Sequence, residues 1–364
     1  MAKSASKKSK KGKGNSVKKS SKGNALRFTY DLEGQKPAVW KAGNSKEVSV
    51  RELPISKGIA GVSMRLRPGG IRELHWHAIA AEWGFFITGN ARVTVLNPDG
   101  QWDTQEYGPG DIFFIPMGHA HYIESIGGDE CHFILAFNNG AFNEFSTFSV
   151  TAWIAQTPKE VLSKNFGLPG KLFDKFPRKE VYMALGEIPG KKALGQRGRQ
   201  NTARLGHKFP LRAQEGKVYP GGTVKMADVS NFPVSDNMAG ALMTLKPGAL
   251  REMHWHPNAN EWGYLLGGKL RITLFAADEG SLTEELGPGE VFYIPQGCGH
   301  YLENVGDEEA EILLVFDNGA YQEISISEWI ADTPPEVVSA VFGVSGKVIG
   351  ELPREEVFIS AGSR

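Results

Sequence analysis

The stretch that decides the fold reads GGIRELHWHAIAAEWGFFITG over residues 69–89 and returns as GALREMHWHPNANEWGYLLGG over residues 248–268. Each copy carries two histidines with one residue between them and then a glutamate, and a third histidine follows further along the chain. The first set is His75, His77, Glu82 and His121; the second is His254, His256, Glu261 and His300. Each member of the second set lies 179 residues after its counterpart. This constant offset indicates a duplicated domain with one metal site per copy.

The duplication extends well beyond these side chains. Gly-Pro-Gly at residues 108–110 returns at 287–289, and Trp-Ile-Ala at 153–155 returns at 329–331. The second of these offsets is 176, so the first copy carries three extra residues between its third histidine and Trp153.

Short apolar runs separated by Gly and Pro favour strands over long helices. Strands are expected over 91–95, 111–115, 133–137 and 270–274. Thr-Pro-Lys-Glu at 157–160 and Thr-Pro-Pro-Glu at 333–336 read as capping boxes with proline at the first helical position, and Gly167 and Gly343 as helix ends. We therefore expect an all-β chain of two tandem jelly-roll barrels with short peripheral helices.

The expected domain organisation follows from composition and from the repeat. It comprises a disordered Lys-rich tail (1–24), a first domain (25–182), a linker rich in Gly, Lys and Arg (183–218) and a second domain (219–364). Both domains are long enough to bury a core of their own.

Charge is distributed unevenly although the formal net charge of the 364 residues is zero. Nine of the 41 basic residues are lysines of the tail, which leaves 32 basic against 41 acidic residues elsewhere. A lysine tail either contacts a polyanion such as nucleic acid or only improves solubility, and the second interpretation is favoured. The tail lacks the apolar segment of a signal peptide, and no apolar run is long enough for a membrane span, so a cytoplasmic location is expected.

The two cysteines argue against a disulfide framework. Cys131 and Cys298 do not occupy equivalent places in the repeat, and both are expected to be small buried side chains.

The residue types of each set fit a catalytic metal better than a structural one. Alternate residues of a strand face the same side, so His75 and His77 point together. Three imidazoles and one carboxylate leave coordination positions open, which suits Mn(II) or Fe(II) and not a closed thiolate zinc site. A single histidine here could equally be structural, but its duplication with three partners favours a metal ligand.

The spacing is specific enough to show a resemblance. Gly69 is followed by five residues, His-x-His, four residues, glutamate, six residues and Gly89; Gly110 is followed by five residues, Pro-x-Gly, two residues and His121. The second copy repeats this pattern and adds Asn304, where the first has Ser125. These stretches resemble the two cupin motifs, and the chain after its tail is similar to bicupins, most closely to the oxalate decarboxylases. The resemblance implies oxalate as substrate, one Mn(II) per domain, dioxygen as co-catalyst, and a trimer or hexamer.

Two arginines and one glutamate are candidates for the reaction itself. Arg72 and Arg251 lie three residues before the first histidine of each copy, which places them on the opposite face of the strand unless a bulge intervenes. A surface role is therefore as compatible with the spacing as a substrate role, and the resemblance favours substrate binding, with a catalytic part for Arg72.

The extra residues of the first copy contain Glu144, which matches the proton-donating glutamate of the family's Ser-Glu-Asn-Ser-Thr loop. Asn143 and Phe145 depart from that pattern. The shorter second loop contains Glu323, whose alignment across the gap stays open. Because this shorter loop lacks a clear lid, we expect the second metal to have a mainly structural or electron-relay role.

Alternative functions remain open at this stage. They are a bicupin oxalate oxidase, a non-enzymatic storage-like bicupin and an iron bicupin dioxygenase. The four aromatic side chains Trp76, Trp83, Phe85 and Phe114 are either a dry wall of the metal site or ordinary core.

Overall fold

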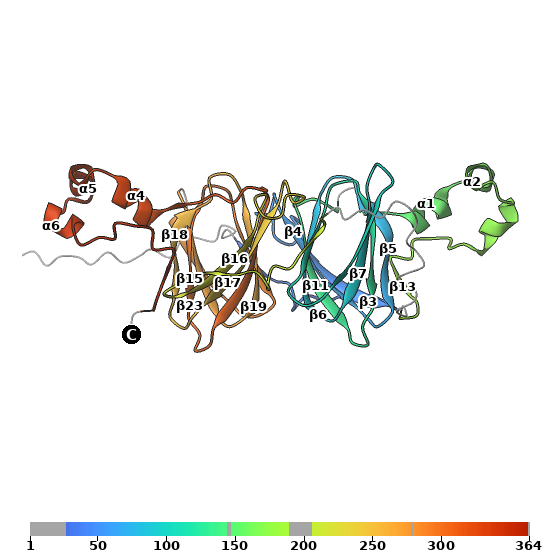
Figure 1. The fold of residues 1–364 in the computed structure, drawn as a ribbon, viewed down its shortest axis with the longest axis horizontal. Helices are drawn as coiled ribbons and strands as arrows, with labels where there is room; N and C mark the ends of the chain where they lie inside the picture. Colours follow the sequence, from blue (N-terminus) through green and yellow to red (C-terminus); the bar gives the residue numbers. More distant parts are fainter. Residues whose placement is uncertain (1–26, 144–146, 189–205, 278–279, 363–364) are drawn as a thin grey trace, which may run out of the picture.

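The computed structural model describes residues 27–143, 147–188, 206–277 and 280–362. Two β-barrels lie side by side, with a small helical arm at each outer end (Figure 1). Neighbouring strands pair antiparallel throughout the four sheets. The all-β class and the two tandem barrels predicted from the repeat are confirmed.

The first barrel consists of two packed sheets. The larger contains, in order, β14 (Lys208–Phe209), β9 (Ile112–Ile115), β6 (Glu82–Thr88), β11 (Cys131–Phe137), β4 (Ala60–Leu66), β3 (Gly43–Val48) and β2 (Ala38–Trp40). The smaller contains β12 (Thr147–Ser149), β5 (Gly70–His77), β10 (Ala120–Ser125), β7 (Ala91–Leu96) and β8 (Trp102–Tyr107), and β13 (Met183–Leu185) also pairs with β5.

The second barrel repeats this order. Its larger sheet contains β1 (Thr29–Asp31), β22 (Glu290–Ile294), β19 (Glu261–Gly267), β24 (Ala310–Phe316), β17 (Ala239–Leu245), β16 (Gly222–Ala227) and β15 (Lys217–Tyr219). Its smaller sheet contains β21 (Gly280–Leu286), β20 (Leu270–Ala276), β23 (Gly299–Asn304), β18 (Leu250–Trp255) and β25 (Ile324–Ser325), and β26 (Ile359–Ser360) pairs with β18.

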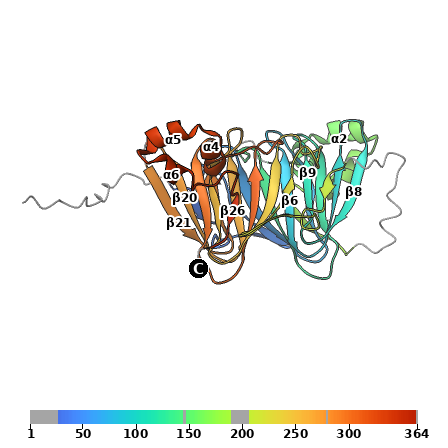
Figure 2. The same ribbon diagram turned by 60° about the vertical axis from the view of Figure 1, so that its left-hand side comes forward.

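The helices form two arms that lie toward the same edge of the molecule in both views (Figures 1 and 2). One contains α1 (Val150–Gln156), α2 (Lys159–Phe166) and the 3-10 helix η1 (Gly170–Lys175); the other contains α4 (Ile326–Asp332), α5 (Pro335–Phe342) and α6 (Gly346–Ile349). Gly167 and Gly343 end α2 and α5 in the left-handed conformation, as predicted.

The predicted capping boxes are wrong. Pro158 and Pro334 are themselves the N-caps of α2 and α5, and neither helix has a side-chain cap. Thr157 instead ends α1 and donates its hydroxyl hydrogen to the Trp153 carbonyl, 2.7 Å away. Thr157 belongs to the end of α1, which lies immediately before Pro158. The sequence Thr-Pro-Lys-Glu by itself does not indicate that a helix precedes it.

The two barrels exchange strands at their junction. The N-terminal strand β1 pairs with β22 of the second barrel, whereas β14 pairs with β9 of the first. The range 183–218, expected to be a linker, therefore contains β13 and β14 of the first barrel and most of β15 of the second. Residues 189–205 and the predicted tail at 1–24 lie outside the described residues.

A buried apolar cluster joins the barrels and explains the place of two tryptophans. Trp83 of the first barrel packs on Gly240 of β17, and Trp262 of the second packs on Gly61 of β4. A Cβ atom at either glycine would lie 2.3 Å from the indole ring, so only glycine fits there. Because Trp83, Phe85 and Phe114 all belong to this cluster, they are core between the barrels and not a wall of the metal site.

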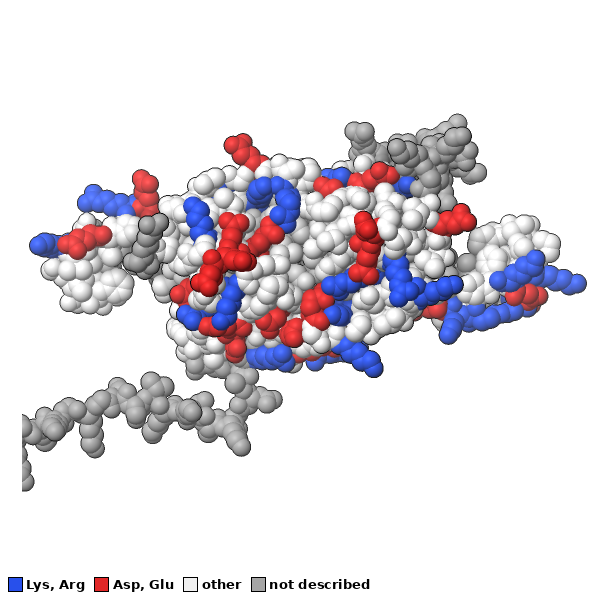
Figure 3. Space-filling model, turned by 90° about the horizontal axis from the view of Figure 1, so that it is seen from below, with Lys and Arg blue, Asp and Glu red and all other residues white. Residues whose placement is uncertain are grey.

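The cysteines and the charged surface of the barrels show no special arrangement among the described residues. Neither cysteine forms a disulfide; Cys131 is buried, as predicted, and Cys298 is half-buried. Burial raises the pKa of the Cys131 thiol to about 12. Acidic and basic side chains are interspersed over the barrels on the face in Figure 3. No helix in the described part of the chain is long and apolar enough to cross a membrane.

Candidate metal centres and the first-barrel cavity

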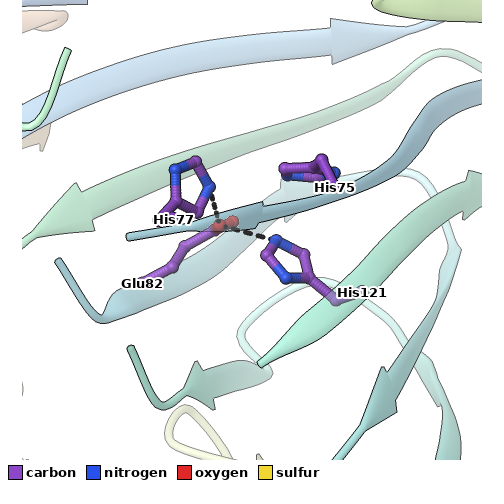
Figure 4. Close-up of side chains that lie close together, drawn as sticks. All are labelled: His75, His77, Glu82 and His121. Carbon is purple, nitrogen blue, oxygen red and sulfur yellow. Dashed lines mark hydrogen bonds and ion pairs between the residues drawn. The ribbon is translucent and has the colours of Figure 1, made fainter. Parts of the chain in front are cut away.

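Each barrel brings its three histidines and its glutamate together in the interior. His75 and His77 lie on β5, Glu82 begins β6, and His121 on β10 is the direct cross-strand neighbour of His75 (Figure 4). The second set follows the same register, with His300 opposite His254. In both sets all four residues are buried, and their ligand atoms lie within 4.8 Å of one another. All eight predicted ligands are therefore placed as two metal-binding clusters.

Backbone carbonyls orient the imidazole rings. His75 Nδ1 lies 2.5 Å from the Glu73 carbonyl oxygen, and His121 Nδ1 lies 2.9 Å from that of His119. Since a carbonyl only accepts, each Nδ1 carries the hydrogen, and the Nε2 lone pair of the neutral ring faces the cluster. In the second barrel the equivalent carbonyl contacts hold His254 and His300. His256 is held by the Gln322 carbonyl, whereas Nδ1 of its counterpart His77 lies 3.5 Å from the Thr147 hydroxyl.

Unpaired atoms in the clusters fit a cation. Glu82 Oε2 lies 3.0 Å from both His77 Nε2 and His121 Nε2. Among the described residues, no hydrogen-bond partner is found for the buried atoms His77 Nε2, Glu82 Oε1 and Glu261 Oε1. Buried acceptors that converge in this way are costly unless a positive charge lies among them. The donor set is open to an octahedral metal of the Mn(II) or Fe(II) type.

Electrostatics keep the ligands in the protonation states that a metal needs. Burial, with the charge of Arg72, holds the pKa of His75 well below its usual range. Burial alone would raise the pKa of Glu82, but His121 and His77 beside it hold that pKa well below its usual range. His254 and Glu261 are shifted in the same directions for the same reasons. These shifts favour a neutral imidazole at His75 and His254 and an ionised carboxylate at Glu82 and Glu261, the forms that bind a metal.

A bulge turns Arg72 into the barrel. Between the paired positions His75–His121 and Arg72–Ile123, β5 advances three residues while β10 advances two. The extra residue on β5 reverses the alternation, so Arg72 is buried on the same side as the histidines. The same irregularity separates Arg251 from His254. The bulge that the sequence analysis required for the arginines to face the metal sites is therefore present in both barrels.

A strained residue holds each arginine. Arg72 Nη1 donates to the Tyr182 carbonyl at 3.0 Å, and its guanidinium lies 3.9 Å from the centre of the Tyr182 ring. Tyr182 has a φ of 61°, and its amide donates to Glu73 Oε1 at 2.6 Å. Arg251, Phe358 (φ 57°) and Glu252 repeat this arrangement. Tyr182 and Glu73 were not identified from the sequence as residues that position the arginine. The only signal in the sequence was the Arg-Glu pair at 72–73, which returns at 251–252.

The first barrel contains a cavity of about 200 Å³ beside its metal cluster. Its wall contains the polar residues Glu47, Arg72, Asn143, Thr147, Glu180 and Tyr182 and the apolar residues Val62, Met64, Ile123, Leu135, Phe137 and Phe142. None of the four aromatic residues considered for a dry wall contributes, since Trp76 packs outside against Phe148 and Trp153.

The loop that differs between the copies distinguishes the two arginines. In the second barrel Arg251 is ion-paired with Glu323, which also accepts a hydrogen bond from the Tyr321 hydroxyl. Among the described residues of the first barrel, Arg72 has no carboxylate within ion-pair distance. Glu144, the predicted proton donor, lies with 145 and 146 outside the described residues.

Two antiparallel barrels, each closed around three histidines and a glutamate, define a bicupin metalloprotein. Residues 31–172 and 212–350 match the Cupin family model. The chain is 42% identical over 323 residues to the oxalate decarboxylase OxdC of Bacillus subtilis (strain 168), a match that covers 87% of this chain and 82% of that protein. The chain therefore belongs to the cupin family and, within it, to the oxalate decarboxylases.

Further comparisons agree with this family. A probable oxalate decarboxylase of Arthroderma benhamiae is 35% identical over 338 residues, covering 92% of this chain and 82% of that protein. A solved structure of Bacillus subtilis oxalate decarboxylase, from work on its Mn(II) centres, superposes with a TM-score of 0.88 at 38% identity. That superposition covers 94% of this chain and 90% of the other.

Proposed function

We propose that this protein is an oxalate decarboxylase, a carboxy-lyase that converts oxalate to formate and CO2. The observation that carries the proposal is the cavity of the first barrel, where Arg72, which has no carboxylate partner among the described residues, lines the same space as a complete His3Glu cluster. A small dicarboxylate matches both groups in size and charge. The relatives compared above are named as an oxalate decarboxylase and a probable oxalate decarboxylase, in agreement with the proposal.

Mn(II) is the proposed metal in each cluster, by analogy with the Mn(II) centres of the Bacillus subtilis enzyme. When bound, it supplies Lewis-acid and one-electron chemistry, with dioxygen as the proposed co-catalyst. His75, His77, Glu82 and His121 would hold it in the first barrel, and His254, His256, Glu261 and His300 in the second.

Arg72 is the proposed catalytic and substrate-binding arginine. Its buried guanidinium, fixed by Tyr182, pairs with a substrate carboxylate and holds the C–C bond in one orientation. The apolar wall of Val62, Leu135 and Phe137 excludes water from the reacting carbon. Arg251 stays a predicted substrate-binding residue, and its carboxylate partner in this structure is Glu323.

Glu144 is the proposed proton donor. Cleavage of the C–C bond releases CO2, and the carbon that remains takes the proton of the Glu144 carboxyl to become formate. The second barrel supports this role by internal analogy. Glu323 lies two residues after Tyr321, as Glu144 lies two residues after Phe142, and Glu323 reaches the arginine of its own site.

Product analysis with oxalate at mildly acidic pH tests this function in the Mn(II)-loaded wild type, in Glu144→Ala and in the matched control Glu323→Ala. We expect the wild type and the control to release formate and CO2 in equal amounts. Glu144→Ala should lose formate production at least about 100-fold, because general acid catalysis contributes about that factor. Hydrogen peroxide from the wild type would make the protein an oxalate oxidase instead, and absence of turnover would reject both activities.

A trimer or hexamer is the proposed assembly. Both helical arms carry exposed apolar side chains, among them Trp153, Phe166, Trp329, Val341 and Phe342. Such apolar area projecting from opposite ends suits contacts between copies of the chain. The cytoplasmic location and an inert tail stay predictions.

A further inference from the structure

One polar residue interrupts an otherwise apolar row in the first cavity. Glu47 on β3 is the cross-strand neighbour of Val62 on β4, which is in turn the neighbour of Leu135 on β11. Val62 and Leu135 line the cavity, and so does Glu47. Residues opposite one another across antiparallel strands share a face, so the Glu47 side chain is directed to the interior of the barrel.

The second barrel has no carboxyl group at this position. Its corresponding row is Met226 on β16, Ala241 on β17 and Leu314 on β24, in the same register. Met226 packs against the apolar core of that barrel. Packing of the barrel alone therefore does not require a glutamate here, and the first copy differs from the second by a carboxyl group facing its cavity.

The position of Glu47 is fixed from two directions. Its backbone amide and carbonyl are both bonded to the Gln35 side chain, each at 2.9 Å. Its carboxylate accepts a hydrogen bond from Asn143 Nδ2, and Asn143 lines the same cavity. That bond occupies Oε1, and no hydrogen bond from a described residue occupies the second carboxyl oxygen, which is therefore available to a ligand. A side chain held in this way is preorganised for binding.

The net effect of the groups around Glu47 is to raise the pKa of its carboxyl group. Burial raises the pKa of the Glu47 carboxyl above its ordinary value, the hydrogen bond from Asn143 opposes this rise, and the charge of Glu52 adds to it while that of Arg51 opposes it. The charged and titratable groups that share its cavity are Arg72, His75, His77, Glu82, Glu180 and Tyr182.

We propose that Glu47 is a further substrate-contacting residue of the first cavity, which in its protonated form donates a hydrogen bond to a carboxylate of the substrate and in its ionised form repels it. The inference rests on the proposed function, since it assigns a second contact to the same dicarboxylate that Arg72 binds. Arg72 supplies the charge, and Glu47 makes binding depend on pH.

The test compares wild type with Glu47→Gln, a neutral donor at every pH, and with Glu47→Met, which copies the second barrel. KM and kcat for oxalate are measured from mildly acidic to neutral pH, with equal Mn(II) content verified for each variant. We expect the wild-type KM to rise about tenfold as Glu47 ionises, the factor that one hydrogen bond to a charged group carries. Glu47→Gln should abolish that rise, and Glu47→Met should have a KM about tenfold above the acidic wild-type value throughout.

Two kinetic outcomes would overturn the proposal. One is a Glu47→Gln enzyme whose KM follows pH as in wild type. The other is an equal rise of KM in both variants at acidic pH, which would reduce Glu47 to a support for Asn143.

Infrared difference spectroscopy supplies a readout that does not need turnover. A protonated-carboxyl band should titrate in wild type and be missing from Glu47→Gln. If no variant decomposes oxalate, the proposed function fails while this band still decides whether Glu47 holds a proton. Identical bands in the two proteins would reject the inference on their own.

Discussion

Glu73 follows Arg72 directly and accepts hydrogen bonds from two segments that are distant in sequence. Its Oε1 accepts from the Tyr182 amide at 2.6 Å, and its Oε2 accepts from the Thr151 hydroxyl at 2.5 Å. Tyr182 in turn presents its carbonyl and its ring to Arg72. Glu73 thus positions Arg72 through a residue whose left-handed backbone is unfavourable without such support.

We predict that Glu73→Gln lowers kcat/KM for oxalate about tenfold while the Mn(II) content stays unchanged. The amide weakens the charge-assisted bonds that hold Tyr182, so Arg72 loses its fixed orientation. Steady-state kinetics with metal analysis measures both quantities. The matched control is Glu252→Gln, which disturbs Arg251 in the same way. Equal losses in the two variants would contradict a special role for the first cavity.

Glu33 forms a half-buried ionic cluster where the N-terminal segment passes between the barrels. Burial raises its pKa, but hydrogen bonds from His132, Ser63, Lys46 and Arg65 outweigh burial and hold the pKa of Glu33 well below its usual range. A carboxyl whose pKa is depressed by folding stabilises the native state above its unfolded pKa of about 4.3 and loses this contribution as pH falls further.

We predict that Glu33→Gln lowers the free energy of unfolding by roughly 2 kcal/mol near neutral pH. The difference from wild type should shrink steadily as the pH falls below about 4, because Glu33 then becomes protonated in the unfolded chain. Denaturant unfolding at several pH values measures it. A difference that does not vary with pH would show that lost packing, and not charge, causes the effect.

At the scale of elements, the N-terminal strand β1 precedes the first barrel in sequence but belongs to the larger sheet of the second barrel. Phe28, just before β1, is fully buried in the core of the second barrel, and Leu32, just after it, is buried in the cluster between the barrels. The Glu33 amide then donates to the Gly289 carbonyl at 3.1 Å. This segment therefore ties the two barrels together.

We predict that a chain lacking residues 1–34 is less stable by at least about 3–5 kcal/mol, the cost of emptying the site of one buried phenylalanine. A chain lacking only residues 1–24 should unfold like the wild type, because the Lys-rich tail has almost no apolar side chains to bury. Thermal and denaturant unfolding compare the two. The interpretation of β1 as a structural tie fails if both truncations behave alike.

At the scale of the whole molecule, the two metal clusters are equivalent in geometry and differ in the surroundings of the arginine beside them. Arg251 already binds a carboxylate of its own chain, whereas Arg72 faces a cavity. The second cluster is therefore the better candidate for the structural or electron-relay role predicted from its shorter loop.

We predict that Glu261→Ala removes one of the two metals per chain and also lowers turnover at the first site. The variant loses the only carboxylate of the second cluster, and a buried ligand set with one member missing binds metal poorly. Metal analysis, thermal unfolding and formate production are the measurements. If turnover persists unchanged with the first metal in place, the second metal has no relay role.

The sequence alone determined the duplication, the eight ligands, the strand-rich class and the ends of α2 and α5. These features depend on spacing along one segment, which fixes the face that a side chain occupies or the conformation of a single glycine. The metal chemistry followed from the same local information, because His75, His77 and Glu82 carry it in their residue types.

Only the tertiary structure decided which groups share the cavity of the first barrel. The bulge that turns Arg72 inward depends on pairing with β10, the strain at Tyr182 depends on Glu73, and Glu47 enters the cavity through its register with β4. The position of Trp83 also depends on tertiary structure, because its ring packs on Gly240 of the second barrel. Such contacts join segments far apart in the chain, and local periodicity contains no information about which distant strand will be the neighbour.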